Sequence, residues 1–277
     1  MIDTYTPAEF NNKKQVILQN LISSIIKPLN NPQSYFIVGQ PGAGKTTLAN
    51  IFASYLGGNV IFISGDDYRK FHPRYKELHD KYGDDAVLYT QDFSGKMTKA
   101  LINDLSTKKY NLIIEGTLRT FQVPVETKKL LTSKGYSSTL AAILVRPEIS
   151  YLSTIKRYLM MKEFGTIPRQ TPKDHHDLVV ASIIKNLDII YKNKFFTDIQ
   201  IFTRESNRIY NMQTTPDINP ADIFNKEFGR ELTSNEINLI INDYKEYVSK
   251  SDILQIIDEY KNQIHQQIPF WKNTVRQ

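Results

Sequence analysis

The sequence predicts an α/β fold, in which a central, mainly parallel sheet is flanked by helices and followed by a helical C-terminal appendage. Two observations support this prediction. Short apolar runs typical of buried strands alternate with stretches of helical spacing over residues 34–202. Beyond Thr214 only charged, amphipathic helical patterns remain. Strands that alternate with helices pair in parallel, so we expect a ligand site at their carboxyl ends.

The best-defined motif is a glycine-rich loop after the first strand. It follows the apolar run 35–38, precedes a helical pattern that stops at Gly57-Gly58, and has the spacing glycine, four residues, Gly-Lys-Thr. In this context backbone N–H groups and a helix N-terminus bind a polyphosphate. We therefore predict a P-loop kinase-like fold. The predicted nucleotide-binding residues are Gly39, Gln40, Pro41, Gly42, Ala43, Gly44, Lys45, Thr46 and Thr47.

The cofactors expected at this loop are ATP and Mg²⁺. Lys45 is placed to reach the outer phosphates, and the Thr46 hydroxyl is the expected metal ligand. Phosphoryl transfer then needs further cations and a group that orients the nucleophile. We expect these parts at the ends of the other strands and in a loop over the site.

Composition restricts the function classes. The 277 residues include no cysteine, which excludes disulfides, thiol catalysis and cysteine-based zinc sites. The net charge of +6 comes from 35 basic and 29 acidic residues spread along the chain. This balance suits an anionic small molecule or an acidic protein partner, and we expect no nucleic-acid partner. Without a signal-peptide core in residues 1–10 or a long apolar run, we expect a cytoplasmic protein with no membrane partner.

The remaining elements follow in order. Strands are expected at Tyr35–Val38, Val60–Ile63, Leu112–Glu115, Leu140–Val145 and Ile199–Phe202. Besides the helix after Thr46, helices are expected over residues 7–29, 72–81, 85–108, 125–134, 148–162, 173–191, 222–228, 235–248 and 253–268. The proline-containing stretch 215–220 reads as a linker. We therefore expect a P-loop domain over residues 1–213 and the appendage over residues 214–277.

Two carboxylates follow expected strands. Asp66 comes after the second strand, where it is a candidate base for an attacking hydroxyl; the alternatives are a helix cap and a role for its neighbour Asp67 instead. Glu115 ends the third strand. It is a candidate for the metal side or for a substrate hydroxyl, or it holds N–H groups of the next loop. Arg119 can pair with Glu115 or reach an anionic substrate group.

Two arginines flank a proline-bounded segment. Arg157 lies in an expected helix with no acid three or four residues away, so the usual helix-surface ion pair is missing. Arg169 lies in the following loop. Together they are typical of a lid that closes on a γ-phosphate, and the alternative is a pair of solvated basic residues. The adjacent His175-His176 lack a second ligand at the i+4 spacing of a helical zinc pair, which favours core or cap histidines.

Five groups of residues, in this order and spacing, resemble the zeta/PezT toxin family over residues 34–211. They are Gly39–Thr46; Gly65-Asp66 with Tyr68 and His72-Pro73; Tyr110–Thr120 with Val123-Pro124; Ser150–Ile155 with Arg157-Tyr158; and Arg169 with Thr171-Pro172-Lys173.

The resemblance implies an ATP-dependent kinase that phosphorylates the 3′-hydroxyl of the sugar in UDP-N-acetylglucosamine and so blocks peptidoglycan precursor synthesis. It also implies a toxin–antitoxin pair in which a small helical antitoxin covers the ATP site. By position, Lys45 and Thr46 would serve ATP and Mg²⁺, and Asp66 would be the general base. Arg157 and Arg169 would contact the γ-phosphate. The implied substrate contacts are Glu115, Thr117, Arg119 and Thr127.

The chain departs from the family pattern at two places. Ser64 stands where members often have an acid, and Lys99 stands where members place a substrate-side glutamate. Two other classes therefore stay open: a P-loop kinase of another small molecule or of a nucleic-acid end, and a nucleotide-dependent switch. A switch needs hydrolysis-coupled loops and a water-positioning residue, whereas strand-end carboxylates and paired arginines favour a kinase.

Overall fold

The computed structural model describes residues 3–165 and 170–248, with the side chains of residues 244–248 left aside. The chain divides into two compact units, residues 1–229 and 230–277. Among the described residues, every helix is too short or too polar to span a bilayer. The helix expected over residues 253–268 lies outside the described part.

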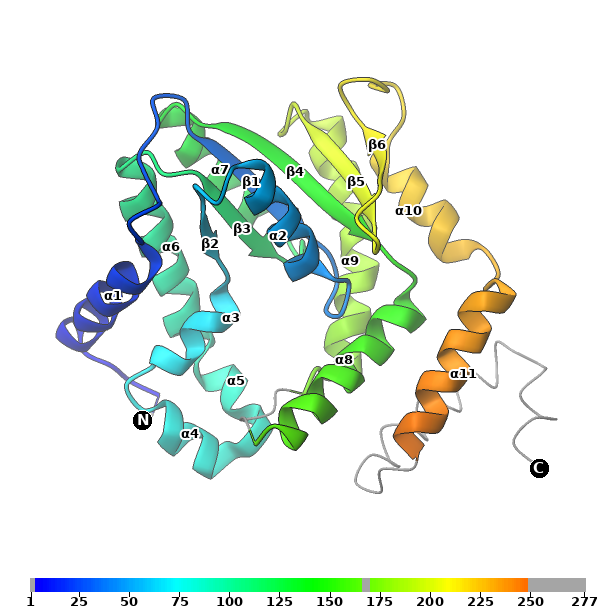
Figure 1. Ribbon diagram of the computed structural model, residues 1–277, viewed down its shortest axis with the longest axis horizontal. Coiled ribbons are helices and arrows are strands. Elements are labelled where there is room, and N and C mark those ends of the chain that lie inside the picture. The colour runs from blue at the N-terminus through cyan, green and yellow to red at the C-terminus, as the bar shows by residue number, and fades with distance from the viewer. Residues whose placement is uncertain (1–2, 166–169, 249–277) are drawn as a thin grey trace. The chain divides into compact units, whose positions relative to one another are not determined.

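The first unit is built on one sheet (Figure 1). Its order is β2-β3-β1-β4-β5-β6, with β1 to β5 parallel to their neighbours and β6 antiparallel to β5. The strands are β1 (Gln33–Val38), β2 (Ile61–Ile63), β3 (Leu112–Gly116), β4 (Ser137–Leu144), β5 (Ile199–Thr203) and β6 (Arg208–Asn211). The predicted α/β class with a mainly parallel sheet is confirmed.

The two faces of the sheet are covered differently. On one face α2 (Lys45–Tyr55) packs Leu48 and Phe52 against Ile37, Ile113 and neighbouring strand residues. The other face is covered by longer helices: α6 (Gln91–Thr107), α7 (Gln122–Ser133) and α9 (Lys173–Lys192). Figure 1 shows α2 on the near side of the sheet.

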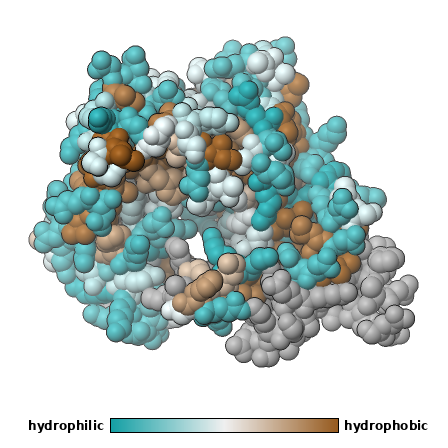
Figure 2. Space-filling view, viewed as in Figure 1, coloured by the Kyte–Doolittle hydropathy of each residue, from teal (hydrophilic) through white to brown (hydrophobic). Residues whose placement is uncertain are grey.

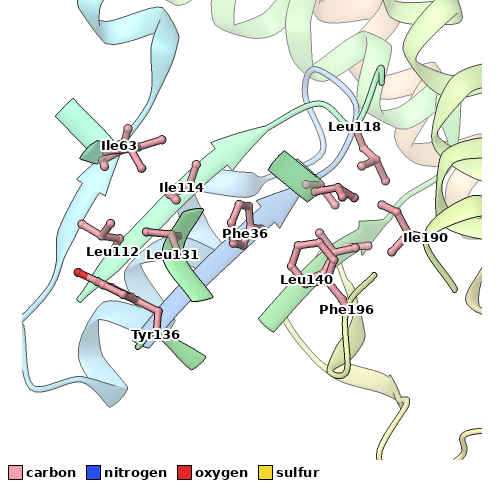
Figure 3. Close-up of a cluster of buried hydrophobic side chains, with 14 of the residues drawn as sticks. Phe36, Ile63, Leu112, Ile114, Leu118, Leu131, Tyr136, Leu140, Ile190 and Phe196 are labelled. Atoms are coloured by element: carbon pink, nitrogen blue, oxygen red, sulfur yellow. The ribbon is translucent and has the colours of Figure 1, made fainter. Parts of the chain in front are cut away.

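The larger core lies under these longer helices (Figure 3). Phe36 stands at its centre because β1 is the middle strand, pairing with Ile114 of β3 and Leu140 of β4. Leu131 of α7 and Ile190 of α9 close over this layer, and both side chains are fully buried. Apolar residues buried on both faces explain why the strands read as continuous apolar runs.

The remaining helices connect and extend the first unit. They are α1 (Pro7–Leu21), α3 (Gly65–Tyr68), α4 (Tyr75–Tyr82), α5 (Ala86–Tyr89), α8 (Pro147–Glu163) and α10 (Pro220–Gly229), with short 3₁₀ turns at Arg69–Phe71 and Gly83–Asp85. In the second unit, α11 (Ser234–Val248) begins at a capping box, in which Glu236 accepts from the Thr233 N–H at 2.8 Å.

Two predicted helices are wrong in extent. The helix expected over residues 7–29 ends at Leu21, because Ser23 and Ser24 are weak helix formers and Pro28 disfavours helical backbone at the residue before it. The single helix expected over residues 85–108 is broken at Thr90. There Arg69 donates to the Val87 carbonyl oxygen at 2.7 Å and so takes an acceptor that a continuous helix would use.

Two further features differ from the prediction. β6 was not predicted, since it is a four-residue edge strand in which only Tyr210 is buried, so it has little apolar signal. The structure also places α10 with the first unit, whereas the sequence assigned it to the appendage. Arg146 explains this placement: it is 5% exposed and donates to the carbonyl oxygens of Glu227 and Phe228, both at 2.8 Å.

Candidate nucleotide-binding and phosphoryl-transfer site

The loop between β1 and α2 has the backbone geometry of an anion-binding loop. Gly42 and Gly44 have φ angles of +79° and +96°, in the left-handed region that favours glycine. A Cβ on Gly42 would also come within 1.9 Å of the Ser150 carbonyl oxygen on α8. The helix begins directly at Lys45, so successive N–H groups lie at a helix N-terminus. These residues fit a polyphosphate.

Lys45 is the centre of the site. It is 8% exposed, and its ammonium group donates to the carbonyl oxygens of Gly39 at 3.1 Å and Gln40 at 3.2 Å. Its Nζ lies 3.7 Å from Oε1 of Glu115. Burial lowers the pKa of Lys45, while the Glu115 and Asp66 carboxylates oppose that shift. The loop therefore holds its cation beside a carboxylate of the neighbouring strand.

Glu115 reaches Lys45 because of strand register. It lies on β3 opposite Ile37 of β1, two residues before the loop begins. Burial raises the pKa of Glu115; the Lys45 ammonium opposes this, and the negative charges of Asp66 and Asp67 add to it. Parallel register thus brings the ends of β1, β2 and β3 into one electrostatic environment, as the strand-end rule predicted.

Asp66 lies on α3, just after β2, and is exposed. Its Oδ1 accepts from Nε of Arg69 at 2.9 Å. Arg69 is itself held from the other side, where its Nη1 donates to the Val87 carbonyl oxygen and to the Thr90 hydroxyl at 3.2 Å. The sequence analysis missed Arg69, although an acid and an arginine three residues apart in a helical segment are a recognisable pair.

The predicted arginines have different outcomes. Arg157 is exposed on α8 and donates from Nη2 to the Thr171 hydroxyl at 3.3 Å, across the segment that contains residues 166–169. Its charge lowers the pKa values of both Lys45 and Glu115, so it belongs to the same electrostatic environment. Arg169 lies outside the described residues.

The other predicted substrate contacts surround β3 and α7. Thr117 is half-buried and Arg119 is exposed. Burial lowers the pKa of His175, and the charge of Arg119 lowers it further while that of Asp66 opposes. Arg119 therefore lies on the Asp66 side of the site. The Thr127 hydroxyl donates to the Val123 carbonyl oxygen within α7, at 2.8 Å.

Three observations complete the description of the site. Thr46 and Thr47 are exposed in the first turn of α2. The described residues hold no cluster of three or more histidines and carboxylates that could bind a metal by themselves. Arg204, missed by the sequence analysis, follows β5 and donates from Nη1 to the Gly42 carbonyl oxygen at 3.3 Å. Its position directly after an expected strand is the signal that identifies Arg204 as a candidate.

The surface is hollowed at this place. Figure 2 shows a hollow in the centre of the view, and Figure 1, seen from the same side, places the β1–α2 loop and the carboxyl ends of the strands at its edge. The two residues that depart from the family pattern differ in exposure: Ser64 is buried directly after β2, and Lys99 is exposed on α6.

A glycine loop that joins a central parallel strand to a helix, with a buried lysine facing a neighbouring strand-end carboxylate, defines a P-loop protein of kinase-like fold. The chain belongs to the Zeta toxin family, whose profile matches residues 20–215. This confirms the resemblance drawn from the sequence.

Relatives and a solved structure agree with this membership. The chain is 43% identical to Toxin PezT of Streptococcus pneumoniae serotype 4 over 215 residues, which cover 76% of this chain and 83% of that protein. It is 37% identical to Toxin zeta of Streptococcus pyogenes over 237 residues, covering 85% and 82%. A structure from the PezAT chromosomal toxin–antitoxin system of S. pneumoniae matches with a TM-score of 0.77 and 34% identity, covering 96% of this chain and 99% of that one.

Proposed function

We propose that this protein is a kinase that transfers the γ-phosphate of ATP to the 3′-hydroxyl of the sugar in UDP-N-acetylglucosamine. The observation that carries the proposal is the position of Lys45: buried in the phosphate-binding loop, 3.7 Å from Glu115 and within the field of Asp66 and Arg157. A phosphate-binding cation beside a carboxylate pair and an arginine has the parts that phosphoryl transfer needs.

The nucleotide side of the site is the loop and the start of α2. The N–H groups that follow Gly42 and Gly44 would bind the phosphates, and Lys45 would move from the loop carbonyls to the outer phosphate oxygens. The Thr46 hydroxyl would hold Mg²⁺, which neutralises charge on the phosphates when it is bound. Arg157, with Arg169, would stabilise the charge that develops on the transferred group.

The acceptor side is formed by α3 and the end of β3. Asp66 would accept the proton of the acceptor hydroxyl as that oxygen forms its bond to the γ-phosphorus, and the bond from phosphorus to the oxygen shared with the β-phosphate breaks to release ADP. Glu115, Thr117, Arg119 and Thr127 would contact the sugar nucleotide. A carboxylate and hydroxyls suit sugar hydroxyls, and an arginine suits a diphosphate or an amide carbonyl.

The substrate is tested by incubating the protein with ATP, Mg²⁺ and a panel of UDP-sugars and measuring each mass. We expect one added phosphate on UDP-N-acetylglucosamine. Lys45→Ala should abolish transfer in a folded protein, and Asp66→Asn should keep ATP binding while turnover falls about 10²–10⁴-fold. Asp67→Asn is the matched control for Asp66. If only another class of acceptor gains a phosphate, the protein is still a kinase, but UDP-N-acetylglucosamine is not its substrate.

The biological role follows from the family. We propose that the protein is the cytoplasmic toxin of a toxin–antitoxin pair, that its product blocks cell-wall precursor synthesis, and that a small helical antitoxin covers the ATP site. The similar S. pneumoniae structure comes from a toxin–antitoxin system, which supports this partner. Co-expression tests it: a cognate antitoxin should abolish ATP binding in the purified complex. An antitoxin complex that binds ATP with unchanged affinity would contradict the proposed mode of inhibition.

A further inference from the structure

A buried chain of polar side chains runs from α9 to the phosphate-binding loop. Nε2 of His176 lies 2.9 Å from the Ser150 hydroxyl on α8, and Nε2 of Gln40 donates to the same hydroxyl at 3.3 Å. Gln40 also donates to the Val145 carbonyl oxygen at 2.7 Å. His176 is 1% exposed, and Gln40 and Ser150 are 0% exposed. Nothing in the proposed chemistry uses His176 or Ser150.

Asp177 sets the position of the proton on the His176 ring. Nδ1 of His176 lies 3.2 Å from Oδ1 of Asp177, so the carboxylate favours a proton on Nδ1 and leaves Nε2 as an acceptor. The single proton of the Ser150 hydroxyl is then shared between two acceptors, Nε2 of His176 and the Pro147 carbonyl oxygen, each at 2.9 Å, while the hydroxyl oxygen accepts from Gln40. Burial lowers the pKa of His176, which favours this neutral form. Buried away from water, Ser150 and His176 have no solvent to replace a partner that is lost.

Gln40 connects this chain to the reacting groups. Its side chain is fixed by Ser150 and Val145, while its main-chain carbonyl oxygen accepts from Nζ of Lys45 at 3.2 Å. Oε1 of Gln40 is buried and has no hydrogen-bond partner among the described residues, so the amide depends on the bonds made by Nε2. The close approach of Ser150 to Gly42 shows independently that α8 packs against this loop.

We infer that His176 is a positioning residue, which through Ser150 and Gln40 holds the phosphate-binding loop and Lys45 in the arrangement that accepts the nucleotide. This inference rests on the proposed nucleotide site but not on the identity of the acceptor. If these hydrogen bonds only stabilise the fold, variants that lose them should be less stable but bind the nucleotide with unchanged affinity. Measuring both quantities therefore separates the two roles.

The test compares three variants. His176→Leu keeps a buried apolar volume and removes the bond to Ser150, Ser150→Ala removes the link from the other side, and His176→Gln retains an amide group near the position of Nε2. We expect the first two to weaken ATP binding, measured by calorimetry, about tenfold, with the KM of the acceptor unchanged. His176→Gln should recover most of the lost affinity. The double variant His176→Leu/Ser150→Ala should lose no more than either single variant.

The matched control is Tyr136→Phe. The Tyr136 hydroxyl donates to the Tyr110 carbonyl oxygen in the buried core at the opposite end of the sheet, so its loss should lower stability and leave ATP affinity unchanged. If His176→Leu does not fold, Ser150→Ala against this control decides the question. ATP affinities of the His176 and Ser150 variants equal to that of the control would overturn the inference. Lys45→Ala, run in parallel, shows whether the nucleotide site itself is wrongly assigned.

Discussion

Replacement of Gly42 by alanine tests how the phosphate-binding loop is held. The residue has a φ of +79°, where an L side chain costs about 1–2 kcal/mol. Its Cβ would also lie 1.9 Å from the Ser150 carbonyl oxygen and 2.9 Å from the carbon of that group. Both atoms belong to backbone inside α8, so the clash cannot be relieved by turning a flexible side chain. The loop or the helix must shift by more than 1 Å.

The size of the effect follows from these two terms. Overpacking of this kind costs about 1–3 kcal/mol, so Gly42→Ala should lower the free energy of unfolding by roughly 2–5 kcal/mol. The shift should also move Gln40 and Lys45. We expect ATP affinity to fall at least tenfold, because a misplacement of about 1 Å at a site can cost about 10²-fold in activity.

Gly57 provides the matched control. It has a φ of +59°, and an added Cβ would meet nothing within 4 Å. Gly57→Ala should therefore cost only the backbone term, partly offset by the lower entropy of the unfolded chain, or about 1 kcal/mol. Urea unfolding and calorimetric ATP titration measure both quantities. Equal losses of stability in the two variants, with equal ATP affinity, would refute the reasoning about the contact with Ser150.

Three further predictions concern other parts of the chain. Arg69→Ala should lower kcat about 10–100-fold while ATP affinity is kept, because it frees Asp66 from its 2.9 Å bond; an unchanged kcat would contradict this. His72 is 3% exposed, and burial lowers its pKa from 6.5, so the unfolded chain takes up a proton more readily and stability should fall as pH drops below about 6.5. Urea unfolding measured across pH should show that the free energy of unfolding depends less on pH in His72→Gln than in the parent protein. An equal pH dependence in the two proteins would contradict this prediction. The hydrogen bond from Arg230 is the main cause that lowers the pKa of Glu236 to about 2. The stability that Glu236 gives to α11 should therefore be fully present above pH 4.5 and lost as pH falls through about 2. NMR titration of the carboxylate checks this, and Arg230→Ala should raise the pKa of Glu236.

The core of the fold was predictable because its physical signals are local. Each buried parallel strand appears in the sequence as an apolar run. The glycine loop between β1 and α2 appears as a motif that is specific to phosphate-binding loops. Because ligands bind at the carboxyl ends of parallel strands, the sequence also predicted that Asp66, Glu115 and Arg119 lie at the same edge of the sheet. The structure brings the first two within the electrostatic field of Lys45.

What the sequence could not show depends on contacts between distant residues. The break at Thr90 exists because Arg69, 18 residues before Val87, donates to the Val87 carbonyl oxygen that a continuous helix would use. The assignment of α10 to the first unit depends on Arg146, 81 residues from the carbonyl of Glu227. Neither partner leaves a periodic signal, because each is a single polar side chain that reaches a main-chain oxygen. Helix ends and domain boundaries were therefore less predictable than strands.

The two halves of the site have separate supports, and this bears on how acceptor preference can vary. The nucleotide half is held from α8 and α9, through Ser150 and the backbone contact at Gly42. The acceptor half is held by Arg69, which ties Asp66 to the junction of α5 and α6. The Lys45–Glu115 contact at 3.7 Å joins the two halves, but their supports, Ser150 and Arg69, lie in different elements, so loss of one support need not disturb the other half. Lys99 is exposed on α6, the helix whose Ser94 hydroxyl donates to the Gly65 carbonyl oxygen next to Asp66. We therefore predict that substitution of Lys99 changes acceptor preference while ATP binding is retained.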